Sequence, residues 1–142
     1  METGSEHERR RYGDGGCELM AAWAQEFERV RPLIEAALEY SDGTHTIDDV
    51  REFIATGRAQ LWPGKTAVVV TEIVHYPQRK TCNGWLAAGD NAELAEMYKS
   101  IEAWAKAAGC KRATIIGRRG WAKTYLADYG YTPKWVTFSK DI

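Results

Sequence analysis

The sequence predicts an α/β fold of the α+β kind, with a helical N-terminal part and a central mixed, mostly antiparallel sheet flanked by helices. The run Thr66–Pro77 is apolar and rich in β-branched residues, as is typical of a central strand covered on both faces. The next predicted strand, Thr81–Gly89, follows after a link of three residues, which favours antiparallel pairing. Segments with helical periodicity lie on both sides of these strands.

Composition limits the classes of protein to which the chain can belong. Its 142 residues fit one domain, and 44% are apolar, enough for a sizeable core. A net charge of −1 gives no overall attraction to nucleic acid or to an anionic membrane, and the longest apolar run is too short to span a bilayer. The three cysteines lack metal-ligand spacing, so we expect no metal, and reduced thiols in a cytosolic setting.

The N-terminal third is predicted to consist of an arm and three helices. Residues 1–16 are polar, glycine-rich and charged, so we expect a flexible or partner-bound arm before a single domain over 17–142. Pro32 is expected to separate a first helix from a second helix over Pro32–Tyr40. The first helix has an apolar stripe made of Leu19, Met20, Trp23, Phe27 and Val30.

The third helix is marked at both ends. Thr46 and Asp49 have the spacing of a capping box, and Gly57 is placed to end the helix. A short strand over Ala59–Gly64 is expected next, ended by its Pro-Gly pair. The apolar face of the helix is predicted to contain Ile47, Val50, Phe53 and Ile54.

The C-terminal half of the sequence is predicted to form a helix, a strand, a short helix and a last strand. Asn91–Gly109 is alanine-rich, ends in glycine and has an apolar stripe, so it is a helix candidate. A buried strand is expected over Lys111–Gly117, a short helix over Trp121–Gly130 and a final strand over Tyr131–Ile142. The predicted helical stripe is Leu94, Met97, Ile101, Trp104 and Ala108, and the last strand is expected to place Trp135 and Phe138 in the core.

This order of elements resembles the fold of the GNAT N-acetyltransferases over roughly residues 32–142. The strand "GCKRATIIG" between two helices and the "YGY" before a final strand support the resemblance, although the usual first strand of that fold is not evident. The stretches "VTEIVHYPQRKTCNGWLAAGDNAELAEM" and "IEAWAKAAGCKRATIIGRRGWAK" resemble the small GNAT-like proteins encoded among virion genes of tailed phages and prophages.

The resemblance implies a place for the diphosphate of acetyl-CoA at the start of the long helix, in a pattern Q/R-x-x-G-x-G/A. Gly89 matches its first glycine, but Leu86 replaces the Gln or Arg and Asn91 the last small residue. Asp90 and Glu93 flank the helix start, where a carboxylate can cap the free amides and repel a diphosphate. If the coenzyme binds, the residues implied to hold it are Ala88, Gly89, Asp90, Asn91 and Ala92.

The catalytic residues that the resemblance implies are also missing from the family's usual positions in this sequence. Its general acid is a tyrosine in the following short helix, where the alignment puts Leu126; Tyr125 is one residue away, and packing of Tyr125 against Tyr129 is the more ordinary expectation. Glu72 is the best candidate for a general base and His75 the next, but their spacing in a strand puts them on opposite faces of the sheet. If the chain is an enzyme, we expect Glu72 and Tyr125 to act.

Three functions follow as hypotheses. The first is a non-catalytic GNAT-like protein, without cofactor, that acts as a virion structural or assembly component of a phage or prophage, in the virion or the host cytoplasm. Its partners would be other virion or assembly proteins, or further copies of the chain. The second is a divergent, active, acetyl-CoA-dependent N-acyltransferase. The third is a nucleic-acid adaptor that uses the basic clusters Arg9–Arg11 and Arg118–Lys123, which the overall charge disfavours.

Overall fold

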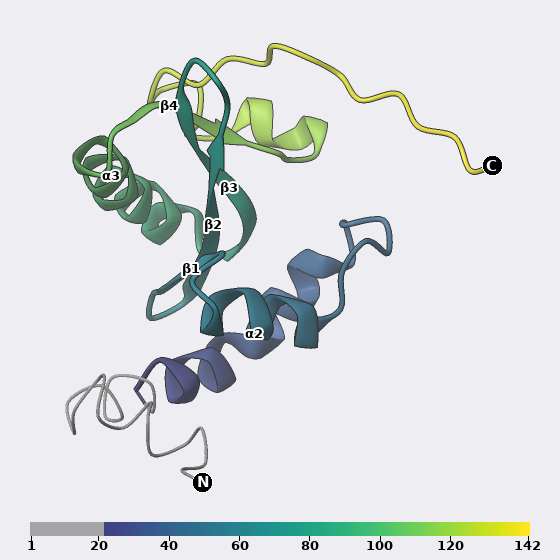
Figure 1. Ribbon diagram of the computed structural model, residues 1–142, viewed down its shortest axis with the longest axis vertical. Helices are drawn as coiled ribbons and strands as arrows, with labels where there is room; N and C mark the ends of the chain where they lie inside the picture. The colour runs from purple at the N-terminus through teal and green to yellow at the C-terminus, as the bar shows by residue number, and fades with distance from the viewer. Residues whose placement is uncertain (1–21) are drawn as a thin grey trace, which may run out of the picture.

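A four-stranded mixed sheet forms the centre of the protein, whose computed structural model describes residues 22–142. The strands lie in the order β1 (Gln60–Pro63), β2 (Ala67–His75), β3 (Lys80–Gly89) and β4 (Cys110–Ile115). The first three pair antiparallel as a meander, whereas β3 and β4 are parallel. Helices cover both faces (Figure 1), which confirms the predicted fold class.

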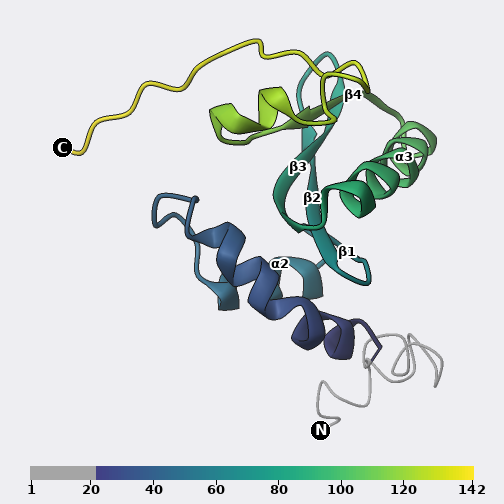
Figure 2. The ribbon, with the colours of Figure 1, turned by 180° about the vertical axis from the view of Figure 1, so that it is seen from behind.

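Each face of the sheet has its own hydrophobic core, because successive residues of a strand point to opposite sides. Helix α3 (Asn91–Ala107) covers one face, and the N-terminal helix (residues 22–38) and α2 (Ile47–Ala55) cover the other (Figure 2). The α3-side core contains Ala67, Val69, Cys82, Leu94, Tyr98, Ile101, Ala105, Cys110 and Leu126. The core on the other face contains Phe27, Val30, Ile34, Val50, Ala59, Val68, Val70 and Leu86.

A register shift in the β2–β3 pair changes which residues of β3 face α3. Val70 pairs with Leu86 and Thr71 with Gly84, so Trp85 is an extra residue in β3. Because of this bulge, Trp85 and Leu86 both contribute to the core below the N-terminal helices. Gly84 is thereby turned toward α3, where a Cβ atom on it would lie 3.4 Å from the hydroxyl oxygen of Tyr98.

The N-terminal helix runs without interruption through Pro32, so the predicted break into two helices is wrong. Residues 22–38 are all helical, and Pro32 lies on the exposed side of the helix. Phe27, Val30 and Ile34 occur before and after the proline on one face, and all three are buried. Burial of this common face outweighs the cost of the missing hydrogen bond, which is about 3 kcal/mol in an exposed helix.

Helix α2 confirms the predicted capping box. The Thr46 hydroxyl accepts a hydrogen bond from the backbone N–H of Asp49, whose carboxylate accepts one from the N–H of Thr46 at 2.8 Å. Val50 is fully buried and Ile47, Phe53 and Ile54 are half-buried, in agreement with the predicted face.

Helix α3 and β4 form a crossover that makes β4 parallel to β3. The helix begins after its cap Asp90 and ends at Ala107, with Gly109 at a φ of +89° just beyond it, as the sequence predicts. Its buried face is turned slightly from the predicted stripe, because Tyr98 and Ala105 are buried where Met97 and Trp104 are only half-buried. Strand β4 begins at Cys110, one residue before the predicted start.

The C-terminal segment differs from prediction in two ways. Instead of a helix over Trp121–Gly130, a short 3-10 helix, η1 (Arg119–Lys123), is followed by turns. The Thr124 hydroxyl donates to the Trp121 carbonyl at 2.6 Å and ends η1. The predicted last strand is absent from the described chain, because residues 131–142 extend away from the sheet and no strand pairs with them (Figure 1). Trp135 and Phe138 are 83% and 92% exposed, so their predicted place in the core is wrong.

Three further expectations concern the first strand of the fold, membrane-spanning helices and the N-terminal arm. Residues 22–59 contain helices and turns but no strand, in keeping with the missing first strand of the resemblance. No helix within residues 22–142 is long and apolar enough to cross a membrane. The predicted arm, the start of the N-terminal stripe and Arg9–Arg11 lie outside the described residues.

Candidate functional site

The strand-to-helix junction at Gly89 needs glycine for a packing reason. Its φ of +114° is one that residues with a side chain rarely adopt. A Cβ atom there would also lie 2.2 Å from the carbonyl oxygen of Thr66 and 2.5 Å from the Cα atom of Ala67. The β1–β2 turn therefore lies directly against this glycine, and its presence is explained without a bound phosphate.

Two carboxylates occupy the first turn of α3. The Asp90 carboxylate caps the helix by accepting a hydrogen bond from the backbone N–H of Glu93 at 2.9 Å, as the sequence predicts. The Glu93 carboxylate points back to the sheet, where its Oε1 atom accepts hydrogen bonds from the backbone N–H groups of Thr66 and Ala67, both at 2.9 Å. Both carboxylates therefore have structural partners at the helix start.

The β1–β2 turn is also held from the other side. Arg29 of the N-terminal helix donates to the Gly64 carbonyl at 2.8 Å, and the same guanidinium pairs with Glu26. The hydrogen bond with Glu26 is the main reason that the pKa of Arg29 is raised, with the charges of Glu26 and Glu93 as smaller contributions. The N-terminal helix and α3 thus hold one turn between them.

This geometry does not fit the diphosphate of acetyl-CoA. A diphosphate cradle needs free backbone amides and partial positive charge at a helix N-terminus. Here the amide of Glu93 is bonded to Asp90, and two carboxylates oppose a further anion at the same turn. Of the residues implied to hold the coenzyme, Asp90 forms the cap, Gly89 lies against the β1–β2 turn and Ala88 pairs with Val68 in the sheet. Asn91 and Ala92 are exposed beside them.

A hollow of about 630 Å³ lies next to this helix start. It separates the first turns of α3 from the segment 123–129, and its lining contains both a lysine and an aspartate, so it carries no strong positive charge. The lining residues are Asn91, Ala92, Ala95, Lys123, Thr124, Tyr125, Asp128 and Tyr129.

Two buried tyrosine hydroxyls lie near the point where β3 and β4 separate. The pairing of these strands ends at Gly84 and Ile115, and the remainder of β3 has no partner in β4. The hydroxyl groups of Tyr98 and Tyr125 are buried without a hydrogen-bond partner among the described residues, and the ring centroids lie 6.2 Å apart. Burial raises the pKa of Tyr125 to about 12 and that of Tyr98 still further, so both hydroxyls stay protonated.

The structure does not bring the predicted catalytic pair together. Glu72 is half-buried and its carboxylate accepts a hydrogen bond from the Asn83 amide at 3.0 Å, which in turn accepts one from the Thr114 hydroxyl at 3.0 Å. Asn83 and Gly84 are neighbours in β3 and point to opposite faces, and Gly84 faces Tyr98. Glu72 therefore lies on the sheet face opposite to Tyr98 and its neighbour Tyr125, while His75 is exposed at the end of β2.

Sequence reasoning identified some of these residues and missed others. The expected packing of Tyr125 on Tyr129 is present, with ring centroids 6.3 Å apart. Tyr98 and the chain Glu72–Asn83–Thr114 were not predicted. Tyr98 follows Leu94 by four residues and precedes Ile101 by three, a helical spacing that could have identified it. Nothing local in the sequence indicates that Thr114 reaches Asn83, because that contact depends on the register of β3 and β4.

The basic residues near the C-terminal segment are dispersed. The Arg118 guanidinium lies over the ring of Tyr40, 3.8 Å from its centroid, and so contacts the turn that follows the N-terminal helix. Lys123 lines the hollow beside α3, while Lys111 and Arg112 are exposed on β4. Residues 22–142 contain no group of three or more His, Cys, Asp and Glu side chains that could hold a metal ion.

Comparison with known proteins supports the fold alone. No protein-family model and no curated protein matches the chain. Among solved structures, an aminoglycoside acetyltransferase from an uncultured soil metagenomic sample, in complex with sisomicin, superposes with a TM-score of 0.57 at 9% identity, over 83% of this chain and 89% of that one. Wild-type TTHA1254 from Thermus thermophilus superposes with a TM-score of 0.55 at 16% identity, over 81% and 91% of the two chains.

A third structure agrees with these two. The tetramutant of BH1408 from Bacillus halodurans superposes with a TM-score of 0.55 at 13% identity, over 71% of this chain and 77% of that one. Together with the sheet order and the α3 crossover, these likenesses define the class of the protein as a mixed α/β chain with a GNAT-like, acetyltransferase-like fold.

Proposed function

We propose that this protein is a non-catalytic member of the GNAT-like fold class that acts by binding other proteins, as a virion structural or assembly component of a tailed phage or prophage. One observation supports the non-catalytic part. The Asp90 carboxylate accepts the hydrogen bond of the Glu93 amide at the start of α3, and the Glu93 carboxylate lies beside it on the β1–β2 turn, so two negative charges flank the helix start where an acyl-CoA enzyme would bind a diphosphate.

The binding role is supported by the apolar surface of the C-terminal segment. Trp135, Val136 and Phe138 are exposed within four consecutive positions, an arrangement that usually marks a contact with another protein. The phage assignment rests on the resemblance of residues 70–97 and 101–123 to GNAT-like proteins of virion gene clusters. The partners in this function are other virion or assembly proteins, or further copies of this chain.

The non-catalytic part is tested by thermal unfolding with acetyl-CoA. We expect no rise in the melting temperature of the wild type at millimolar coenzyme. A ligand at a hundredfold excess over its Kd would stabilise the protein by about 2.7 kcal/mol, which such a measurement detects. A clear rise for the wild type would contradict the proposal.

Variants of the helix cap test whether Asp90 is the residue that excludes the diphosphate. Asp90→Gly combined with Asn91→Gly removes the capping carboxylate and opens the turn, and we expect this variant to bind coenzyme better than the wild type. Asp90→Asn is the matched control for charge, because the amide oxygen can still accept the hydrogen bond from Glu93. If neither variant gains affinity, Asp90 is not what excludes the diphosphate.

The assembly role is tested by incorporation of the protein into phage particles. Deletion of residues 1–16 should leave the domain folded, as judged by circular dichroism, but should abolish incorporation of the protein into phage particles. Incorporation at the level of the full chain would show that residues 1–16 are not needed to hold the protein in the particle.

A divergent N-acyltransferase is the second candidate, and the buried hydroxyls of Tyr98 and Tyr125 are the observation that favours it. Buried polar groups without partners are uncommon, and they concentrate at sites that bind ligands. Release of free thiol from acetyl-CoA with a mixture of primary amines tests this candidate. Turnover that Tyr125→Phe abolishes would support it, whereas the absence of turnover would remove this candidate.

A further inference from the structure

Strand β4 leaves one edge of the sheet open. It pairs with β3 on one side, and on its other side no strand of residues 22–142 pairs with it. The opposite edge strand, β1, has only four residues and ends at Pro63, and both features prevent further pairing. Strand β4 has six residues and no proline, so its outer row of N–H and C=O groups can accept another strand.

The C-terminal segment has the composition of the strand that this edge lacks. Residues 132–142 include Thr132, Val136, Thr137 and two aromatic residues, which favour extended pairing. Trp135 is 83% exposed, Val136 61% and Phe138 92%, so the segment buries almost none of its apolar surface. Ile116, the residue after β4, is also 73% exposed and extends the apolar surface at the open edge.

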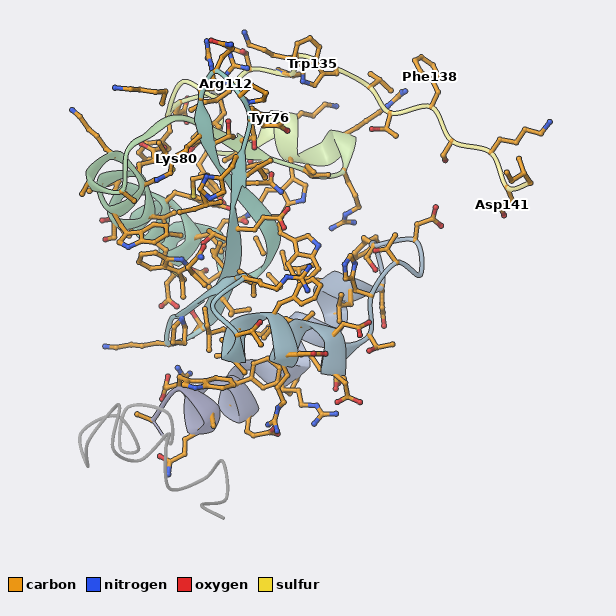
Figure 3. All side chains as sticks on the ribbon, in the orientation of Figure 1. Tyr76, Lys80, Arg112, Trp135, Phe138 and Asp141 are labelled. Carbon is orange, nitrogen blue, oxygen red and sulfur yellow. The ribbon has the colours of Figure 1, made fainter. Side chains whose placement is uncertain are left out.

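The segment starts close to this edge. The hydroxyl of Tyr131 donates a hydrogen bond to the Glu102 carboxylate of α3 at 2.5 Å. Tyr131 also lines a hollow together with Cys110, Lys111 and Arg112, which form the first half of β4. From this anchor the chain runs outward, and Phe138 and Asp141 lie away from the body of the molecule (Figure 3).

We propose that residues 132–142 pair as a strand with the open edge of β4 in a second copy of this chain, and that two copies exchange these strands in a closed dimer. The segment is anchored beside β4 but extends away from its own edge, so one two-fold arrangement provides partners for both segments and both edges. This inference needs only the fold, and it would hold whether or not the protein binds a coenzyme.

The available surface is sufficient for a stable dimer. Each aromatic side chain can bury roughly 150–250 Å², so Trp135 and Phe138 from two copies would bury roughly 600–1,000 Å². Val136 and Ile116 of each copy and the paired backbones add to this area. The sum reaches the range of about 1,200–2,000 Å² that is usual for specific interfaces.

Association of the full chain is the first test. Light scattering after size exclusion should give the mass of a dimer at micromolar concentration. The double substitution Trp135→Asp with Phe138→Asp should weaken the dimer at least tenfold without unfolding the domain, because both side chains are exposed. Tyr76→Asp is the matched control, since Tyr76 is an aromatic residue that is 58% exposed outside the segment, and it should leave the dimer unchanged.

Proline substitutions distinguish strand pairing from simple apolar contact. Successive N–H groups of a strand point to opposite sides, so one of Val136 and Thr137 must donate to the edge of β4. Val136→Pro and Thr137→Pro, made separately, should therefore differ, and one of them should weaken the dimer at least tenfold. If the dimer persists in both variants, strand pairing is ruled out.

Crosslinking between two different chains identifies the occupant of the edge. In a Cys17→Ser background, one chain carries Arg112→Cys on β4 and the other carries Thr137→Cys in the segment, and they are mixed with a short bis-maleimide. Strand exchange predicts a crosslinked heterodimer. A chain carrying both substitutions that crosslinks only within itself would show that the segment pairs with its own edge, and a monomeric wild type would also overturn the proposal.

Discussion

The backbone N–H of Ala67, the first residue of β2, donates a hydrogen bond of 2.9 Å to the carboxylate of Glu93, in the first turn of α3. The same oxygen accepts a second backbone hydrogen bond from Thr66. A carboxylate at a helix N-terminus would ordinarily oppose an anionic ligand, and here it also determines how the helix lies against the sheet. One side chain therefore contributes both to the packing of α3 on the sheet and, together with Asp90, to the poor fit to a coenzyme.

Replacement of Glu93 should destabilise the fold without any ligand present. Glu93→Ala leaves two backbone amides without their acceptor, and we expect a loss of about 1–3 kcal/mol in the free energy of unfolding. Glu93→Gln retains an acceptor oxygen and should lose less. Urea denaturation measures both, with Glu96→Ala as the control, because Glu96 is exposed and its ion pair is a surface pair with Lys99, three residues later. Equal stabilities for Glu93→Ala and Glu96→Ala would contradict the role given to Glu93.

Alanine at Gly89 should be among the most damaging single substitutions. The positive φ and the contact with the Thr66 carbonyl both penalise a Cβ atom, and we expect a loss of about 3 kcal/mol or more. Gly120→Ala is the matched control, since a Cβ atom there has no heavy atom within 4 Å. Thermal unfolding of the two variants makes the comparison, and a mild effect at Gly89 would mean that the β1–β2 turn moves easily.

The capping box of α2 should make stability depend on pH. The pKa of Asp49 is lowered, chiefly because its carboxylate accepts a hydrogen bond from the backbone N–H of Thr46. A carboxyl group whose folded-state pKa is lowered stabilises the fold above its ordinary pKa and loses this effect as the pH falls through the folded-state pKa. The loss should therefore appear below about pH 4.

Asp49→Asn tests this dependence. The difference in urea midpoint between the wild type and Asp49→Asn should be largest near neutral pH and should shrink in acid. Asp48→Asn, one residue earlier in the same turn, is the control. A difference that stays constant from pH 7 to pH 3 would show that the charge of Asp49 has no part in the cap.

Tyr98 and Tyr131 should respond in opposite ways to loss of the hydroxyl group. Tyr98→Phe removes a buried group without a partner, so the free energy of unfolding should stay constant or rise by about 1 kcal/mol. Tyr131→Phe removes the hydrogen bond to Glu102 and should lower it by about 1–2 kcal/mol. If Tyr98→Phe is clearly destabilising, its hydroxyl has a partner, such as bound water or a ligand, in solution.

Local signals were sufficient to predict the parts of the fold that depend on neighbouring residues. Asp90 and Gly109 mark the ends of α3, and Thr46 with Asp49 marks the start of α2, because capping involves residues only a few positions apart. The continuous apolar run and β-branched composition of β2 likewise reflect its own burial. The predicted carboxylate cap of the candidate site came from the same kind of local pattern.

The errors come from contacts between distant residues. Pro32 lies inside a helix because Phe27 and Ile34, on either side of it, are buried by the sheet. Residues 131–142 have the composition of a strand, but whether they pair with the open edge of β4 in their own chain depends on the path of the chain after Tyr131, which composition does not supply. The positions of Glu72 and Tyr125 on opposite faces depend on the β2–β3 register and on the position of the C-terminal turn, and neither is visible in the two residues themselves.

The parallel pairing of β3 with β4 also has a consequence for how the chain folds. Strands β1, β2 and β3 are sequential neighbours and can form as soon as they leave the ribosome, whereas β4 joins only after the whole α3 crossover is made. During that interval the edge of β3 is open and the apolar side of the meander is uncovered. Slow synthesis or a weakened α3 should therefore increase aggregation of the nascent protein more than it lowers the stability of the finished one.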